Sequence, residues 1–188
     1  MARTQRTPFV VLGLLGVSGR QPRSGYEIKK AIDAVISHFW SESHGQLYPV
    51  LKQLASDELI RAQDRNEGRR KKTVYTITPK GRERLRAWLE SPVELGKPRD
   101  ELILKLFFGS ETEIPVLIRH LEAHRDRMKA ILNQCLEYQR QNTRNPDRAI
   151  PFTLITIRAG ISLSEASLRW AEESLKTLAA MTARRPKP

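Results

Sequence analysis

Residues 59–81, LIRAQDRNEGRRKKTVYTITPKG, contain a change from helical spacing to strand-like spacing. Residues 61–63 and 73–78 have the composition of two short strands, and apolar and polar side chains alternate clearly in the second. The connection between them, residues 64–72, contains Gly68 and is mostly charged, so we expect it to be a loop that projects into solvent. The stretch therefore predicts a two-stranded β-hairpin with a basic tip.

Three helical stretches precede this hairpin, and a fourth follows it. The first is the apolar run 8–17, and the second has capping-box form because Glu27 follows Ser24 by three residues. The third begins within residues 43–46 and carries apolar side chains on one face: Leu47, Val50, Leu51 and Leu54. The fourth begins after Pro79. This order predicts a winged helix-turn-helix, and hence a mainly α fold with a small β-hairpin.

The charge of the chain favours a polyanionic partner. It has 33 Lys and Arg against 21 Asp and Glu, a net charge of +12, which suits nucleic acid. The densest basic run, residues 69–72, lies in the predicted hairpin. The third helix of such a fold fits the major groove, and a basic hairpin reaches neighbouring phosphates. A sequence-specific binder of double-stranded operator DNA is the first interpretation, and a non-specific architectural nucleic-acid-binding protein is the alternative.

Four short motifs, in this order, resemble those of the PadR family of transcriptional regulators. They are Gly13-Leu14-Leu15, Ser24-Gly25-Tyr26-Glu27-Ile28, Gly45-Gln46-Leu47-Tyr48-Pro49 with Leu51 and Leu54, and Tyr75-Thr76-Ile77-Thr78 before Gly81. The C-terminal half resembles, in length and helix pattern, the Vir-like helical dimerisation domain of the longer PadR type. The resemblance implies a dimeric winged-helix regulator, usually a repressor that a small molecule or signal releases from its operator.

The resemblance also implies particular DNA contacts. Tyr48 would contact the DNA backbone, Gln46 would lie at or beside the base edges, and Ser24 and Tyr26 would approach phosphate. Position in the predicted fold adds further candidates from the start of the third helix, its second turn and the hairpin tip: His44, Lys52, Arg69, Arg70, Lys71 and Lys72. The chain departs from the family pattern at Glu58, where glycine is common and would adopt a left-handed conformation at the helix end. We expect the turn into the hairpin to differ if Glu58 avoids that conformation.

Two long stretches of the C-terminal half repeat apolar residues at steps of three and four. This spacing is typical of a coiled-coil-like seam. Because the first stripe is broader than a two-helix seam needs, we expect the two helices to join two protomers in a homodimer. The predicted interface residues are Leu117, Leu121, His124, Met128, Ile131, Cys135, Leu154, Ile157, Ile161, Leu168, Leu175 and Leu178.

These patterns divide the chain into four parts. Residues 1–90 form the DNA-binding domain, 91–98 a linker with three helix breakers, 99–183 the dimerisation and effector-binding domain, and 184–188 a basic, disordered tail. A small aromatic effector is a further expected partner, because aromatic walls suit flat ligands. Its expected contacts are Phe107, Phe108, Tyr138, Phe152 and Trp170.

Other classes of protein are not supported by the sequence. It has no nucleophile elbow and no phosphate-binding glycine-rich loop, so we expect no enzyme activity and no cofactor. His120 and His124 have no third ligand at metal-site spacing, so no metal is expected, and the single cysteine, Cys135, is expected to be a buried apolar residue. No apolar run reaches the ~18–20 residues of a membrane span. We therefore expect a cytoplasmic bacterial protein, nucleoid-associated when bound to DNA.

Overall fold

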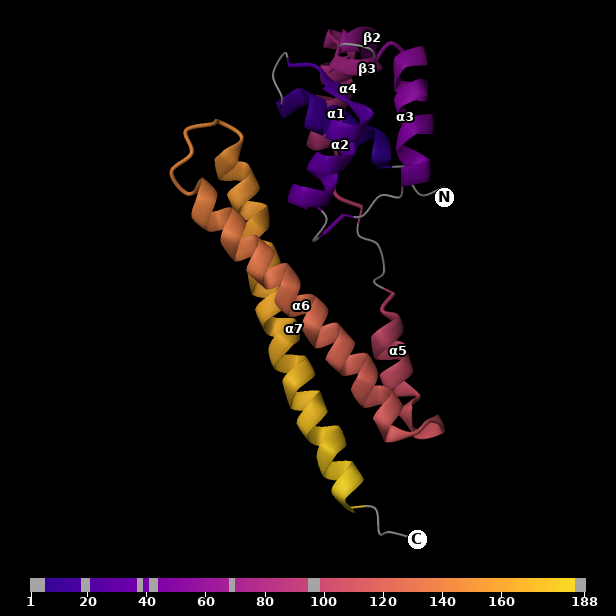
Figure 1. Ribbon diagram of the computed structural model, residues 1–188, viewed down its shortest axis with the longest axis vertical. Coiled ribbons are helices and arrows are strands. Elements are labelled where there is room, and N and C mark those ends of the chain that lie inside the picture. The colour runs from indigo at the N-terminus through magenta and orange to yellow at the C-terminus, as the bar shows by residue number, and fades with distance from the viewer. Residues whose placement is uncertain are drawn as a thin grey trace. The chain divides into compact units, whose positions relative to one another are not determined.

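The computed structural model describes residues 6–17, 21–36, 39–40, 44–67, 70–94 and 99–184. The chain forms two compact units, residues 1–94 and 95–188 (Figure 1). The boundary between them falls in the segment 91–98 that we expected to be a linker. The first unit contains, in chain order, α1 (Thr7–Val17), β1 (Arg23–Ser24), α2 (Gly25–Ala31) continued by a π-helical turn (Ile32–Ile36), α3 (His44–Ser56), β2 (Ile60–Glu67), β3 (Arg70–Ile77) and α4 (Pro79–Glu90).

Helix α1 is the centre of the first unit. It is apolar on nearly every side, and it packs against α2, α3, α4 and β3, as expected of a helix that is buried rather than amphipathic. Phe9 stacks on Trp88 of α4 with the ring centroids 4.7 Å apart. The buried core around α1 draws on all three N-terminal helices and on β2: Phe9, Val11, Leu12, Leu15, Ile28, Ile32, Leu47, Leu51, Leu54 and Ile60.

The sheet has three antiparallel strands in the order β1-β3-β2. Strands β2 and β3 pair from Ile60–Ile77 to Glu67–Arg70, so only residues 68 and 69 separate them. Our expectation of a long loop over 64–72 was therefore wrong: most of these residues lie in the strands. Charged residues weakened the strand pattern, but a projecting two-stranded ribbon exposes both faces and tolerates them. Strand β1 has only two residues, which is too short for an alternation of apolar and polar side chains to be recognised in the sequence.

Glu58 ends α3 in the left-handed conformation, with φ 61°. The Glu58 amide donates to the Ala55 carbonyl (3.1 Å), and the Leu59 amide donates to the Leu54 carbonyl (2.9 Å). These two bonds form a Schellman motif with glutamate in the position usually taken by glycine. The turn into the hairpin thus keeps the glycine-type geometry, and Glu58 bears the steric cost.

Replacing Glu58 with glycine should therefore stabilise the protein. The left-handed conformation costs an L-residue about 1–2 kcal/mol, of which glycine's greater chain entropy gives back about half. We expect Glu58→Gly to raise the free energy of unfolding by about 0.5–1 kcal/mol in urea denaturation. Glu58→Ala is the control, because it also removes the exposed Lys80–Glu58 ion pair (3.5 Å) but keeps a Cβ atom. Equal stability of the two variants would contradict this account.

The second unit is a helical hairpin with a short helix beside it. It contains α5 (Glu101–Phe107), a 3-10 turn (Gly109–Glu111), α6 (Ile114–Asn142) and α7 (Ile150–Arg184). Helices α6 and α7 have 29 and 35 residues and lie side by side over much of their length (Figure 1). The backbone of α7 reaches Arg184, one residue into the expected tail; residues 185–188 lie outside the described part of the chain.

Several residues that we expected between two protomers are already buried within one chain. Leu117, Leu121, Cys135 and Ile157 are at most 5% exposed. They have almost no surface left for a second copy to cover, so the α6–α7 hairpin accounts for this seam. The other predicted interface residues are half-buried: His124, Met128, Ile131, Leu154, Ile161, Leu168, Leu175 and Leu178.

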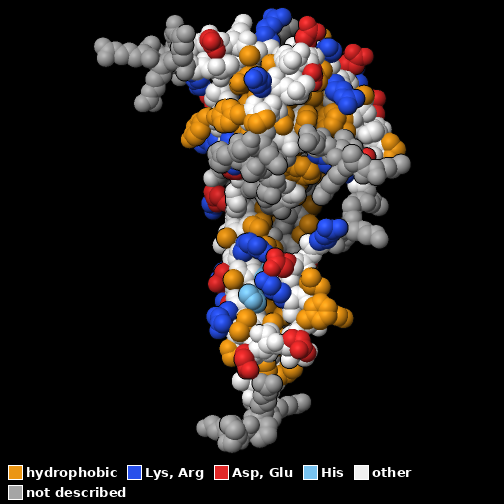
Figure 2. Space-filling model, turned by 90° about the vertical axis from the view of Figure 1, so that its right-hand side faces the viewer, with side chains coloured by type: hydrophobic (Ala, Val, Ile, Leu, Met, Phe, Trp, Pro, Cys, Tyr) orange, Lys and Arg blue, Asp and Glu red, His pale blue; other side chains and the backbone are white. Residues whose placement is uncertain are grey.

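A different set of apolar side chains remains uncovered in the second unit. Figure 2 shows hydrophobic side chains at its surface among charged ones. On α7, Phe152, Ile155 and Leu163 are 61–70% exposed and follow helical spacing. At and beside the end of α5, Phe107 and Phe108 are exposed and pack edge to face. We call the α7 side chains Phe152, Ile155, Ala159, Leu163, Ala166 and Trp170 the outer stripe; all are exposed except Trp170 at its end, which is half-buried.

Candidate nucleic-acid interface

The first turn of α2 is fixed by the predicted capping box. Ser24 is buried, and its backbone amide and hydroxyl each donate to Oε2 of Glu27 at 2.7 Å. In return, the Glu27 amide donates to the Ser24 hydroxyl oxygen at 3.3 Å. Ser24 also pairs with Val74 as part of β1. The same residue therefore begins the helix and attaches it to the sheet.

Glu27 also connects α2 to the hairpin. Nζ of Lys72, on β3, lies 3.2 Å from Oε1 of Glu27. The pKa of Glu27 falls to about 2, chiefly because the Ser24 amide and hydroxyl donate to its carboxylate, with a smaller effect of Lys72. Glu27 is thus ionised at neutral pH. Lys72 lies in the outer half of the hairpin, two residue pairs from the Glu67–Arg70 pair at the tip, with about a third of its side chain exposed.

Gly25 allows the ring of Tyr48 to lie against the start of α2. A Cβ atom on residue 25 would be 2.9 Å from Cε1 of Tyr48 and 3.3 Å from Cδ1 of Leu51. Tyr48 nevertheless remains 56% exposed. Burial, and then the neighbouring Tyr48, raise the pKa of Tyr75 on β3. Tyr48 is therefore positioned against the first turn of α2 with more than half of its side chain exposed.

Helix α3 has one buried face and one exposed face. Leu47, Leu51 and Leu54 are at most 3% exposed and pack into the core. The opposite face exposes Tyr48, Pro49, Lys52, Gln53 and Ser56. Gln53 and Ser56 were not among the predicted DNA contacts, although the phase of the three leucines would have placed them on this face. Gln53 donates to Asp57 at 2.9 Å.

The hairpin presents further cations. Arg61 and Arg65 of β2 are exposed, while Asp64 is engaged by the Thr73 hydroxyl at 2.9 Å. Arg70 and Lys71 belong to β3, but their side chains, like those of His44 and Gln46 on α3, lie outside the described residues, and so does all of Arg69. Among the predicted contacts whose side chains are described, the structure brings Ser24, Tyr48 and Lys72 together. Tyr26 is 71% exposed on the first turn of α2, and Lys52 is exposed one turn beyond Tyr48.

This surface is suited to bind phosphate. The ionised Glu27 carboxylate already occupies the N-terminus of α2, but the same turn carries an exposed hydroxyl on Tyr26. The Tyr48 hydroxyl and the Lys52 ammonium add donors from the neighbouring helix. Backbone phosphate is recognised by such donors, and base edges by side chains of a helix in the major groove.

Comparisons with known proteins agree with this geometry. The model of the transcriptional regulator PadR-like family matches residues 12–87, and that of the virulence activator alpha C-terminal domain matches residues 98–179. A probable transcriptional regulator of Mycobacterium tuberculosis is 25% identical over 172 residues, which is 84% of this chain and 91% of that protein. The negative transcriptional regulator PadR of Bacillus subtilis is 33% identical over 104 residues, or 54% of this chain and 56% of that protein.

Solved structures share the fold over almost the whole chain. Bacillus subtilis PadR in complex with operator DNA has a TM-score of 0.77 at 23% identity, covering 93% of this chain and 99% of that one. The Vibrio cholerae virulence activator AphA has a TM-score of 0.72 at 28% identity, with the same coverage. The Bacillus protein has also been solved with p-coumaric acid, with a TM-score of 0.66 at 22% identity and coverage of 91% and 99%.

The fold and the exposed face of α3 define a DNA-binding protein of the winged-helix class. The two family matches extend this result to the whole architecture. The chain carries a domain of the PadR-like family of transcriptional regulators, followed by a virulence activator alpha C-terminal domain. Its relatives are regulators of transcription, and it is a regulator rather than an enzyme.

The aromatic side chains expected to contact an effector do not form one site. They are Phe107, Phe108, Tyr138, Phe152 and Trp170. Phe107 and Phe108 lie beside the beginning of α6, whereas Tyr138 lies near its end, more than about 30 Å away along the helix. The sequence placed these aromatic residues near the predicted dimer helices. It did not show at which point along those helices each residue lies. Trp170 packs edge-on against the ring of His124, with the centroids 5.6 Å apart.

Neither a cluster of metal-ligating side chains nor a membrane-spanning helix is found among the described residues. In this part of the chain, no group of three or more His, Cys, Asp or Glu side chains is placed to hold a metal ion. No helix within it is both long enough and apolar enough to cross a bilayer. Cys135 is buried, and burial raises the pKa of its thiol.

The lowered pKa of Glu27 predicts a pH-dependent contribution to stability. Because the folded-state pKa lies below the ordinary value of 4.5, the contribution is present above pH 4.5 and is lost as the pH falls toward 2. We expect Glu27→Gln to lower the free energy of unfolding by about 1 kcal/mol at pH 7. The difference from the wild type should shrink between pH 4.5 and 3 in urea titrations.

The control for this prediction is Glu83→Gln, at an exposed position of α4. It removes one carboxylate without a capping role, so its effect should be small at every pH. A Glu27→Gln difference that stays constant from pH 7 to 3 would show that the carboxylate charge does not stabilise the cap.

Proposed function

We propose that this protein is a dimeric repressor that binds a specific operator and leaves it when a small molecule binds. The observation that carries the proposal is the surface formed at the first turn of α2, where Tyr26 is exposed, Tyr48 lies against Gly25 and Lys72 pairs with Glu27. Lys52 is exposed one turn beyond Tyr48 on α3. Beside this surface, the exposed face of α3 is held at a fixed angle by its buried leucines. Rigid placement of this kind favours reading of a particular sequence over general attraction to DNA.

In the proposed complex, α3 lies in the major groove. Its exposed face, with Gln46 near its first turn, faces the base edges. Tyr26, Tyr48 and the start of α2 contact the flanking phosphates, and the β2–β3 hairpin contacts the backbone farther along. Arg69, Arg70, Lys71 and Lys72 supply charge there, and Ser24 acts by fixing the cap.

The outer stripe supports dimerisation through the second unit. Large apolar side chains at 60–70% exposure on a 35-residue helix are costly to leave in water. A second copy would cover them, and a two-fold axis would place two α3 helices on half-sites about 34 Å apart. Repression is supported by the negative regulator PadR of Bacillus subtilis. Release by a small molecule is supported by the structures of that protein with operator DNA and with p-coumaric acid.

The test is selection of binding sites from random double-stranded DNA, followed by fluorescence anisotropy on the selected and scrambled sequences. We expect a palindromic motif with half-sites about 10 base pairs apart and a preference of at least ~10³ over scrambled DNA. Lys52→Ala should reduce the slope of log affinity against log salt by about 0.9 if Lys52 contacts one phosphate. Enrichment of no motif, with equal affinity for both DNAs, would instead indicate an architectural protein.

Gly25→Ala should weaken DNA binding through displacement of Tyr48. The added Cβ atom cannot remain 2.9 Å from the ring, so the ring must move off the start of α2. We expect about a tenfold loss of operator affinity, measured well below the unfolding transition. Gly13→Ala is the matched control, since a Cβ atom there meets nothing within 4 Å. In the Tyr48→Ala background, Gly25→Ala should cost little more; fully additive losses would contradict the role of Tyr48.

Leu163→Glu should separate the protomers. A carboxylate in the middle of the outer stripe would be buried without a partner in the dimer. We expect a monomer at micromolar concentration in analytical ultracentrifugation and at least a tenfold weaker affinity for the palindromic site. Arg158→Glu puts the same group on the polar side of α7 and should leave the dimer intact. If the Leu163→Glu protein remained dimeric, the outer stripe would not be part of the dimer interface.

A further inference from the structure

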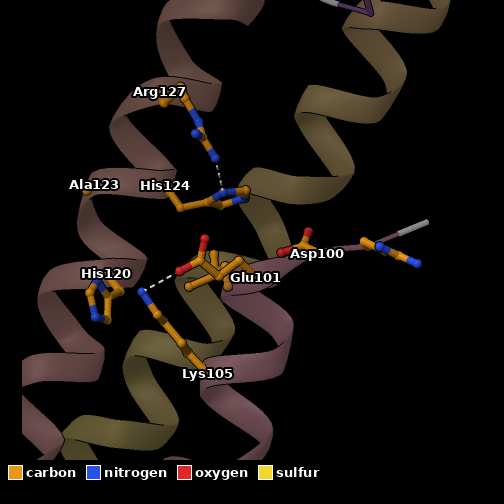
Figure 3. Close-up of a pocket in the computed structure, with 9 residues that line it drawn as sticks. Asp100, Glu101, Lys105, His120, Ala123, His124 and Arg127 are labelled. Atoms are coloured by element: carbon orange, nitrogen blue, oxygen red, sulfur yellow. Dashed lines mark hydrogen bonds and ion pairs between the residues drawn. The ribbon is translucent and has the colours of Figure 1, made fainter.

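The second unit contains a cavity of about 480 Å³ between the start of α5 and the first half of α6. Figure 3 shows the charged and imidazole side chains that α5 and α6 contribute to it. A cavity of this volume is within the range of small-molecule sites. Its lining is mostly polar: Arg99, Asp100, Glu101, Leu102, Lys105, His120, Ala123, His124 and Arg127.

Both carboxylates of the cavity are already engaged. Asp100 is the N-cap of α5 and accepts from the Ile103 amide at 3.1 Å. Glu101 accepts an ion pair from Lys105 at 2.7 Å, one turn along the helix. Neither carboxylate is paired with an arginine of the cavity. The cavity thus has more cationic than anionic side chains, and neither of its two carboxylates pairs with a guanidinium group.

Unlike Lys105, which pairs with Glu101, Arg127 has no carboxylate partner in the described part of the chain. Among the described residues it forms no ion pair, and it donates from Nη2 to Nδ1 of His124 at 3.3 Å. A neutral imidazole nitrogen is a poor partner for a guanidinium group, which presents five donors arranged to match the two oxygens of a carboxylate or phosphate. The geometry therefore leaves a bidentate anion-binding group directed along the wall of the cavity.

His124 connects this cavity to α7. Because Arg127 donates to Nδ1, that nitrogen carries no proton, and Nε2 must donate to the Ser167 hydroxyl at 2.7 Å. Burial and then the neighbouring Arg127 lower the pKa of His124, in agreement with a neutral ring at pH 7. The edge of the Trp170 ring lies beside it. A change at Arg127 would thus reach two residues of α7, one of them in the outer stripe.

We propose that this cavity binds a small polar metabolite through a carboxylate or phosphate group held by Arg127, and that binding withdraws Arg127 from His124. The regulatory meaning of this site rests on the proposed function, in which a small molecule controls operator release. The mostly polar lining suits a polar ligand. Freed from Arg127, His124 can change its bond to Ser167, and so change the packing of α7 under the outer stripe.

The experiment is NMR of the full-length protein with isotope-labelled histidine at pH 7. Sodium phosphate and sodium succinate are the two probes, and sodium chloride at equal ionic strength is the blank. We expect one probe to shift the His124 ring resonances with saturation at millimolar concentration, and the probe that succeeds identifies the anionic group. Shifts that grow linearly with both probes, or that sodium chloride reproduces, would overturn the proposal.

Arg127→Gln should weaken probe binding at least tenfold, and Arg127→Lys should weaken it less. Lys129→Gln is the matched control, because it removes one cation from an exposed position of α6 that does not line the cavity. Thermal melts verify that each variant is folded. Unchanged probe binding in Arg127→Gln would overturn the assignment. Operator affinity without probe is measured separately, so failure of DNA recognition and failure of the cavity assignment give different results.

Discussion

The contact between Ser24 and Glu27 determines how the DNA-facing surface is assembled. Ser24 is at once the last residue of β1, the cap of α2 and the donor that holds the Glu27 carboxylate. Through Lys72 the same carboxylate reaches the outer half of the hairpin. One buried serine and one glutamate thus fix β1, α2 and the hairpin relative to one another. The next residue, Gly25, leaves the space in which Tyr48 lies.

This arrangement separates stability from recognition within α3. Its leucines belong to the core built around α1, so the helix cannot rotate without loss of buried apolar area. The described side chains of its opposite face are exposed, and their contacts include those of Tyr48 with Gly25 and of Gln53 with Asp57. Glu58 then ends the helix in a left-handed turn that leads directly into β2. The strain at Glu58 is the cost of entering the hairpin at the angle that the sheet requires.

Much of the winged helix could be predicted because local signals and tertiary structure agree there. The capping box at Ser24, the leucine spacing of α3 and the alternation in 73–78 each depend on neighbours close in sequence. The length of the strands could not be predicted, since pairing of β2 with β3 satisfies the backbone whatever the charge of the side chains. The contact between Gly25 and Tyr48 joins residues far apart in sequence, and only the family resemblance indicated a role for Tyr48.

The C-terminal half shows the limit of a periodic pattern. The steps of three and four correctly predicted two long helices. This spacing does not show whether the helix that packs against the apolar seam belongs to the same chain or to another. In the structure α6 and α7 pack against each other, with four of the predicted seam residues buried and the other eight half-buried. The stripe left for a second copy runs along another side of α7. The cavity beside Arg127 had no sequence signal either, because its residues come from two helices and include both charges.

The central claim is that α3 reads bases while the start of α2 and the hairpin hold the backbone. Photo-cross-linking of the full-length protein to its selected operator, with 5-iodouracil placed at each thymine of a half-site, tests it most directly. Mass spectrometry of the cross-linked peptides should place the base contacts within His44–Ser56. Cross-links that fall instead on α6 or α7, or that appear equally with scrambled DNA, would contradict the account.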